Sequence, residues 1–112
     1  MKYSRSGRST LPVSVGGVNA RGFWLVLGTK KVFVSYRAFP WFREFTAREL
    51  AAVRRPAAYH LRWPEFDIDL AVESIEHPDR YPLVEKRLRG DPVRVVEQLR
   101  AEKRRTRSVR AS

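Results

Sequence analysis

The chain of 112 residues contains no cysteine, which excludes disulfide bonds, thiolate metal sites and cysteine nucleophiles. Its apolar runs are far shorter than the roughly 20 residues that a transmembrane helix needs. The basic N-terminus is not followed by the apolar stretch of a secretory signal. We therefore expect a cytoplasmic protein with no membrane contact.

Acidic residues are scarce at both ends of the chain. The first 22 residues contain four bases and no acid, and residues 84–112 contain ten bases and four acids. The middle of the chain is mildly acidic, and the formal net charge is +11. This distribution predicts basic termini on either side of a more neutral body.

The composition, 43% hydrophobic and 12% aromatic, is sufficient for one hydrophobic core and excludes a chain that is disordered throughout. We predict an α+β fold with a small antiparallel sheet, short helices and a basic C-terminal helix. Residues 1–12 are predicted to form a flexible basic arm, residues 13–84 the core domain, and residues 85–112 the C-terminal helix and basic tail.

Strands are predicted at 13–15, 23–27, 31–36 and 60–63. The run 23–27 is continuously apolar, as in a strand that is buried on both faces. Residues 31–36 alternate, which places Val32, Val34 and Tyr36 on one face. Gly28-Thr29 between these two strands predicts a tight hairpin.

Three helices are predicted from capping signals. Thr46 and Glu49 have the spacing of a capping box, and the helix that they start is expected to end at Pro56. Asp69 is expected to cap a helix over 70–76. Asp91 and Pro92 suit the start of a helix that continues to about residue 105. Its apolar stripe indicates that its first half docks on another surface, either of this chain or of a partner.

The order of these motifs resembles the bacterial domain of unknown function 2442 family. The resemblance covers about residues 13–84 and is carried by the strand at 22–25, the FPWF block at 39–42, the helix start at Thr46, and the blocks HLRWP at 60–64 and DIDLAVESI at 67–75. The segment after Leu83 is an addition to that core.

The resemblance implies a small α+β domain with an antiparallel sheet. In some relatives this domain is joined to a helix-turn-helix, and others are partners of a second protein in toxin–antitoxin-like pairs. No catalytic residue is established for the family, so the resemblance implies none here.

The basic C-terminal segment predicts contact with nucleic-acid phosphates, by an antitoxin-like or regulator-like bacterial module. The residues expected to make these contacts are Arg94, Arg100, Lys103, Arg104, Arg105 and Arg107, with Lys30 and Lys31 as a second patch. The alternative is a solvated tail that keeps the protein soluble.

A protein-binding module is the second hypothesis. The stripe Val93, Val96 and Leu99 is then expected to bind a second copy of the chain or a partner protein encoded nearby. Most aromatic residues are expected to form the core rather than a stacking surface for bases. Trp41 is the expected exception, because it is flanked by Pro40 and Phe42, and we count it with Val93, Val96 and Leu99 among the residues expected to bind a partner.

No residue pattern indicates catalysis. Asp67 and Asp69 alternate onto one side of the chain, where the pattern favours a structural role over a cation site. His60 and His77 lack a cysteine or serine nucleophile in a recognisable context and do not have zinc-ligand spacing. We therefore expect no enzymatic activity, cofactor, metal or small-molecule substrate.

Overall fold

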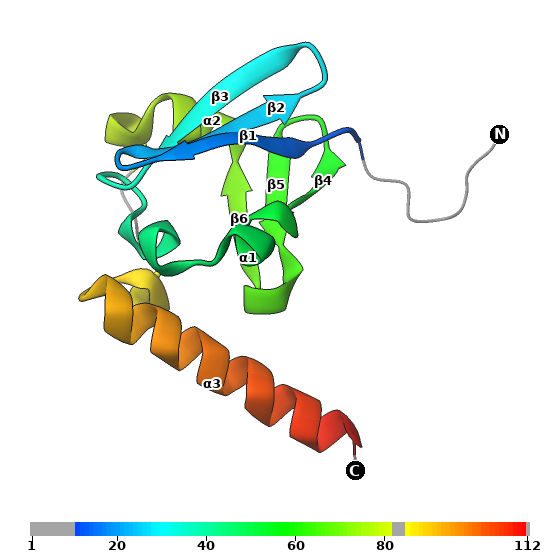
Figure 1. Cartoon of the computed structure of the whole chain (residues 1–112), viewed down its shortest axis with the longest axis vertical. Helices are drawn as coiled ribbons and strands as arrows, with labels where there is room; N and C mark the ends of the chain where they lie inside the picture. The colour runs from blue at the N-terminus through cyan, green and yellow to red at the C-terminus, as the bar shows by residue number, and fades with distance from the viewer. Residues whose placement is uncertain (1–10, 82–84, 112) are drawn as a thin grey trace, which may run out of the picture.

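The computed structural model describes residues 11–81 and 85–111, with side chains as far as Arg104. Two three-stranded antiparallel sheets form the body, which confirms the predicted α+β class (Figure 1). The first sheet contains β1 (Ser14–Asn19), β2 (Gly22–Leu27) and β3 (Lys30–Ser35), in that order. The second contains β4 (Arg54–Ala57), β5 (His60–Trp63) and β6 (Ile68–Ala71).

Short helices connect the strands and a long helix ends the chain. The α-helices are α1 (Ala47–Ala51), α2 (Val72–Glu76) and α3 (Pro92–Ala111). The 3-10 helices are η2 (Pro40–Glu44), η3 (Pro64–Phe66), η4 (Pro78–Arg80) and η5 (Lys86–Leu88).

The predicted hairpin between β2 and β3 is confirmed. Leu27 pairs with Lys30, and Gly28 occupies the turn at φ +66°, a conformation that favours glycine. Val32 and Val34 are buried, as their alternation indicated. The prediction that β2 is buried on both faces is wrong, because Trp24 is 41% exposed on the outer face of this sheet.

An aromatic cluster joins the two sheets through η2. The Phe42 ring lies 5.4 Å from that of Phe23 in β2 and 4.7 Å from that of Trp63 in β5. The expectation that Trp41 is exposed is wrong, since Trp41 and Phe42 are both fully buried. Successive side chains of a 3-10 helix point about 120° apart. The sheets contact η2 on one side and α3 contacts it on another, so two neighbouring side chains of η2 can both be buried.

The capping box at the start of α1 is confirmed. The Glu49 backbone N–H donates to Thr46 Oγ1 at 3.1 Å, and the Thr46 N–H donates to Glu49 Oε1 at 2.8 Å. The helix ends at Ala51, earlier than predicted, and Pro56 lies inside β4. Proline is tolerated there because β4 is an edge strand.

The segment after Asp67 differs from the prediction. Residues 68–71 continue the second sheet as β6, with Leu70 paired to Leu61, so the helix starts only at Val72. Ala71 occupies the N-cap position and no side chain caps α2. The predicted capping role of Asp69 is therefore wrong, because pairing with β5 keeps this segment extended.

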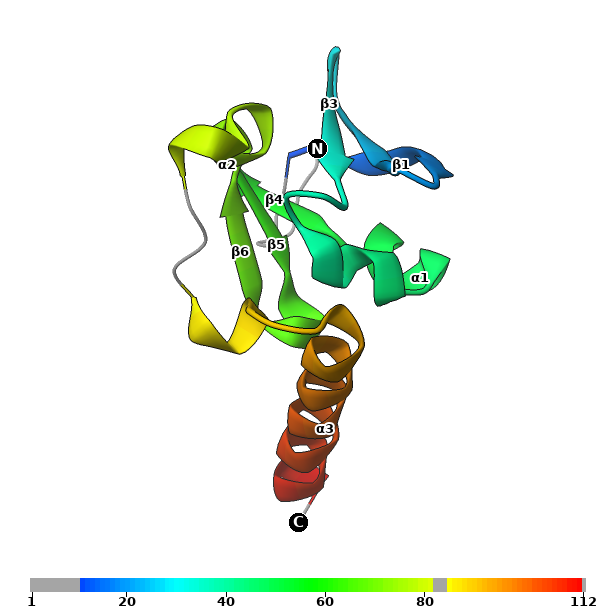
Figure 2. The same ribbon diagram turned by 90° about the vertical axis from the view of Figure 1, so that its left-hand side faces the viewer.

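The start of α3 packs against the body. Leu88, Val95, Val96 and Leu99 belong to the same buried cluster as the residues of both sheets, so the surface on which the first half of α3 docks is the body of its own chain. The second half of α3 extends away from both sheets in two perpendicular views (Figures 1 and 2).

Residues 1–10 of the predicted arm lie outside the described residues. Its last two residues are held by the second sheet: the Leu11 N–H donates to the Arg55 carbonyl at 2.9 Å, and Arg55 donates to the Pro12 carbonyl at 3.1 Å.

Candidate functional site

Helix α3 is fixed to the body by Arg100, one of the residues expected to contact phosphate. Its guanidinium donates to both carboxylate oxygens of Glu49, at 2.7 and 3.2 Å, and to the Glu44 carbonyl at 3.2 Å. The guanidinium and carboxylate are paired in a bidentate arrangement, which is the strong form of this contact. Arg100 therefore has a structural partner within the chain.

The contact with Arg100 changes the pKa of the Glu49 carboxyl. Burial by itself raises the pKa of Glu49, but the hydrogen bonds from Arg100 and from the Thr46 backbone N–H outweigh burial and lower the pKa below its ordinary value. The ionised form of Glu49 is thus the form that the folded protein favours.

Lys103 forms a second anchor one turn further along α3. Its ammonium is hydrogen-bonded to the Glu65 carboxylate in η3 and lies 5.6 Å from the centroid of the Phe66 ring. Both acids that hold α3, Glu49 and Glu65, come from the body of the domain. Arg100 and Lys103 therefore position the helix.

The chain from residue 103 to residue 110 contains five bases and no acid. Arg104, immediately after the last anchor, is exposed. Arg105 and Arg107 lie within α3, but their side chains are outside the described residues. The anchors thus precede a basic helical extension that leaves the body (Figure 2).

A second group of bases surrounds the beginning of α3. Arg94 is exposed and lines an open depression of 670 Å³ together with Arg87, Arg89, Gly90, Asp91, Val95 and Gln98. Arg87 also donates to the Glu85 carboxylate and to the Phe66 carbonyl. Arg94 is therefore an exposed base at the start of α3, where the acids Asp91 and Glu97 are exposed as well.

The predicted patch of Lys30 and Lys31 lies on the first sheet, away from α3 (Figure 1). Lys30 pairs with Glu76 of α2, with 2.7 Å between ammonium nitrogen and carboxylate oxygen. The Lys31 ammonium lies 5.8 Å from the centroid of the Trp24 ring. The structure does not bring these two lysines together with the bases of α3.

The stripe expected to bind a partner is largely used inside the chain. Val96 and Leu99 are buried against the body, and Trp41 is buried in the aromatic cluster. Val93 alone of these four residues is substantially exposed, at 45%. The three buried side chains are covered by their own chain and so present no surface to a partner.

Asp67, which directly precedes β6, and Asp69 within β6 take part in a structural contact. Arg62 donates to Asp67 at 2.7 Å and to Asp69 at 2.8 Å, which agrees with the prediction that both acids lie on one side. The hydrogen bonds to Asp67 and Asp69 raise the pKa of Arg62. Within the described residues, no three histidine or acidic side chains are grouped closely enough to hold a metal ion.

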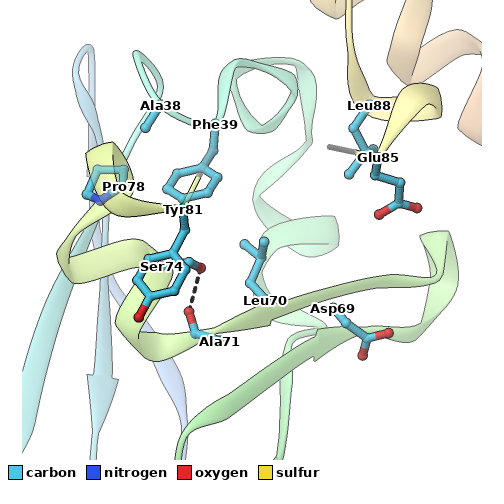
Figure 3. A pocket seen from close by; sticks show the side chains of 10 residues that line it. All are labelled: Ala38, Phe39, Asp69, Leu70, Ala71, Ser74, Pro78, Tyr81, Glu85 and Leu88. Carbon is cyan, nitrogen blue, oxygen red and sulfur yellow. Dashed lines mark hydrogen bonds between the residues drawn. The ribbon is translucent and has the colours of Figure 1, made fainter. Parts of the chain in front are cut away.

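A pocket of 320 Å³ lies between β6, α2 and η5 (Figure 3). Its lining is mainly apolar and includes Phe39, Leu70 and Leu88. The Ser74 hydroxyl at this pocket donates to the Ala71 carbonyl at 2.7 Å, and Asp69 is already paired with Arg62. The polar groups named here therefore have partners within the protein, and His60 and His77 do not line the pocket.

The fold and the ionic anchors define a two-sheet α+β domain to which a basic C-terminal helix is attached. The chain belongs to the family described as "Protein of unknown function (DUF2442)", whose family model matches residues 12–81. This confirms the resemblance, and the match ends before α3. No curated protein and no solved structure matches the chain. No described helix is long and apolar enough to cross a lipid bilayer.

Proposed function

We propose that this chain is a non-catalytic bacterial binding module, antitoxin-like or regulator-like, that contacts the nucleic-acid backbone through α3. One observation carries the proposal: α3 is anchored to the body by Arg100 and Lys103 and then continues as a basic helix away from the body (Figure 2). A projecting helix that is rich in arginine can follow a phosphate backbone without meeting the rest of the domain.

The arrangement of charge supports this proposal over a purely solubilising tail. Glu49 and Glu65 of the body pair with the two anchors, and residues 103–110 contain no acid. Arg94 and Arg104 are exposed at the two ends of the described surface. Arg104 therefore directs its charge toward solvent, at the start of a segment that contains no acid.

The alternative function, self-association or binding to a partner protein, has less support from the geometry. It depended on an apolar stripe of which Val96 and Leu99 are buried within the chain. Val93 remains exposed, but one valine is a small surface for a stable interface.

The proposal is tested by fluorescence anisotropy of labelled duplex DNA, RNA and single-stranded DNA with the full chain, from about 50 to 300 mM salt. We expect the logarithm of the binding constant to fall linearly with the logarithm of salt concentration, because bound phosphates release counterions. If the chain binds none of the three probes at the lowest salt concentration, the proposal is contradicted.

A further inference from the structure

The outer face of the first sheet carries an aromatic pair in which Trp24 is exposed and Phe33 is half-buried. Trp24 on β2 and Phe33 on β3 are cross-strand neighbours, with ring centroids 5.0 Å apart and planes tilted by 58°. Trp24 is 41% exposed, whereas Trp41 and Trp63 are at most 1% exposed. One of the three tryptophans therefore lies on the surface, on a sheet rather than in a loop.

The neighbouring strand leaves this aromatic pair open. Gly16 of β1 lies on the same face, because a Cβ atom there would stand 3.4 Å from the Trp24 Cβ and 3.2 Å from Val26 Cγ2. At Gly17 a Cβ atom would meet nothing within 4 Å. Gly16 therefore places no side chain beside Trp24 on the β1 side of this face.

The charge around the pair favours an anionic ligand. Residues 14–35, which span the whole first sheet, contain three bases and no acid. The Lys31 ammonium lies over the Trp24 ring, 5.8 Å from its centroid, where it can meet a phosphate beside a base that contacts the ring. An apolar protein partner would have to bury this ammonium without a counter-charge from the sheet.

We infer that Trp24 and Phe33, with Lys31, form a stacking site for unpaired bases of single-stranded nucleic acid. Exposed aromatic rings beside basic groups are how proteins hold single strands without reading their sequence. This inference rests on the proposed nucleic-acid binding but not on α3, because the first sheet and the extended half of α3 lie at opposite ends of the molecule (Figures 1 and 2).

Tryptophan fluorescence tests the inference directly in the full chain. Titration with a short oligothymidylate should quench the emission of Trp24, because a stacked base contacts its ring while Trp41 and Trp63 stay buried. In the Trp24→Phe variant the emission should no longer respond to the same probe, because only the buried Trp41 and Trp63 remain.

The Trp24→Ala variant should lose about 5- to 150-fold in affinity for the oligothymidylate, which is the effect of one stacked base. Its affinity for duplex DNA should stay within about twofold, since paired bases cannot reach the sheet. Tyr59→Ala is the matched control: Tyr59 is 74% exposed but lies at the turn between β4 and β5. It should bind both probes like the unmodified chain.

The outcomes separate this inference from the proposed function. Binding with unchanged Trp24 emission, or an equal loss of affinity in Trp24→Ala and Tyr59→Ala, overturns the stacking site and leaves the proposed function standing. Binding of duplex DNA without binding of the oligothymidylate also overturns the stacking site and leaves the proposed function standing. Failure to bind any probe overturns both.

Discussion

Arg100 and Glu49 are joined across 51 positions of sequence by a bidentate contact whose shorter distance is 2.7 Å. Glu49 also accepts the Thr46 backbone N–H, so one carboxylate both caps α1 and holds α3. The same carboxylate therefore links the C-terminal helix to the start of α1, the helix that lies between the first and the second sheet in the sequence.

Removal of this contact should loosen α3. We expect Arg100→Ala to lower the free energy of unfolding by about 1 to 2 kcal/mol, because the variant removes a charge-assisted, partly exposed pair. Urea denaturation monitored by circular dichroism measures the change. Arg104→Ala, which removes an exposed arginine of the same helix, is the control and should change stability by less than about 0.5 kcal/mol.

Leu99 and Val93 provide a test of the docked face of α3. Leu99 is 2% exposed, and Leu99→Ala should cost about 2 to 5 kcal/mol because it leaves a cavity against the body. Val93, on the same helix but 45% exposed, should tolerate Val93→Ala within about 0.5 kcal/mol. Similar losses of stability in the two variants would show that α3 does not dock through this face.

Stability should depend on the ionisation of Glu49. Its pKa in the folded protein is lower than the ordinary value of 4.5, so the folded state binds the proton less readily than the unfolded state. The contribution of the ionised carboxylate is fully present above about pH 4.5 and is lost as the pH falls through the folded pKa.

This dependence is measured by urea denaturation between about pH 3 and 6. The other carboxyl groups titrate in the same range, so the informative quantity is the difference between the unmodified chain and Glu49→Gln. We expect the difference in free energy of unfolding between these two proteins to become smaller as the pH falls. A difference that is constant with pH would contradict the assigned role of Glu49.

Gly22 should not tolerate a side chain. A Cβ atom there would lie 2.0 Å from the Val34 carbonyl oxygen and 3.0 Å from the Ser35 Cα, so β2 and β3 would have to separate. We expect Gly22→Ala to cost about 1 to 3 kcal/mol or more in thermal or urea denaturation. Gly17→Ala, where a Cβ atom meets nothing within 4 Å, is the matched control and should be nearly neutral.

Contacts between near neighbours in sequence could be predicted, and contacts between distant residues could not. The capping box of Thr46 and Glu49 and the hairpin turn at Gly28 are both local patterns, and both are confirmed. The second contact of Glu49, with Arg100, has no local signature. The sequence therefore indicated a basic surface at Arg100 where the structure has an anchor.

The tryptophans show the same limit. Trp24 lies in a continuous apolar run, which indicated burial, and Trp41 follows a proline, which indicated exposure. Both predictions were wrong, because burial depends on which face of the first sheet is covered and on the position of α3 over η2. The run Gly16-Gly17 was the available signal, since it leaves the middle of β1 without side chains and Gly16 lies beside Trp24.

The central claim, that the projecting half of α3 binds phosphates, is tested most directly by two variants that each remove four positive charges. One replaces Arg104, Arg105, Arg107 and Arg110 with glutamine, and leaves both anchors in place. The other is the control and replaces four exposed bases outside α3 with glutamine, namely Arg48, Arg54, Arg80 and Lys86. We predict that the first variant binds duplex DNA more weakly and that its salt slope is shallower by roughly 0.9 for each phosphate that the helix no longer neutralises. The second should resemble the unmodified chain, and an equal weakening of binding in both variants would contradict the account.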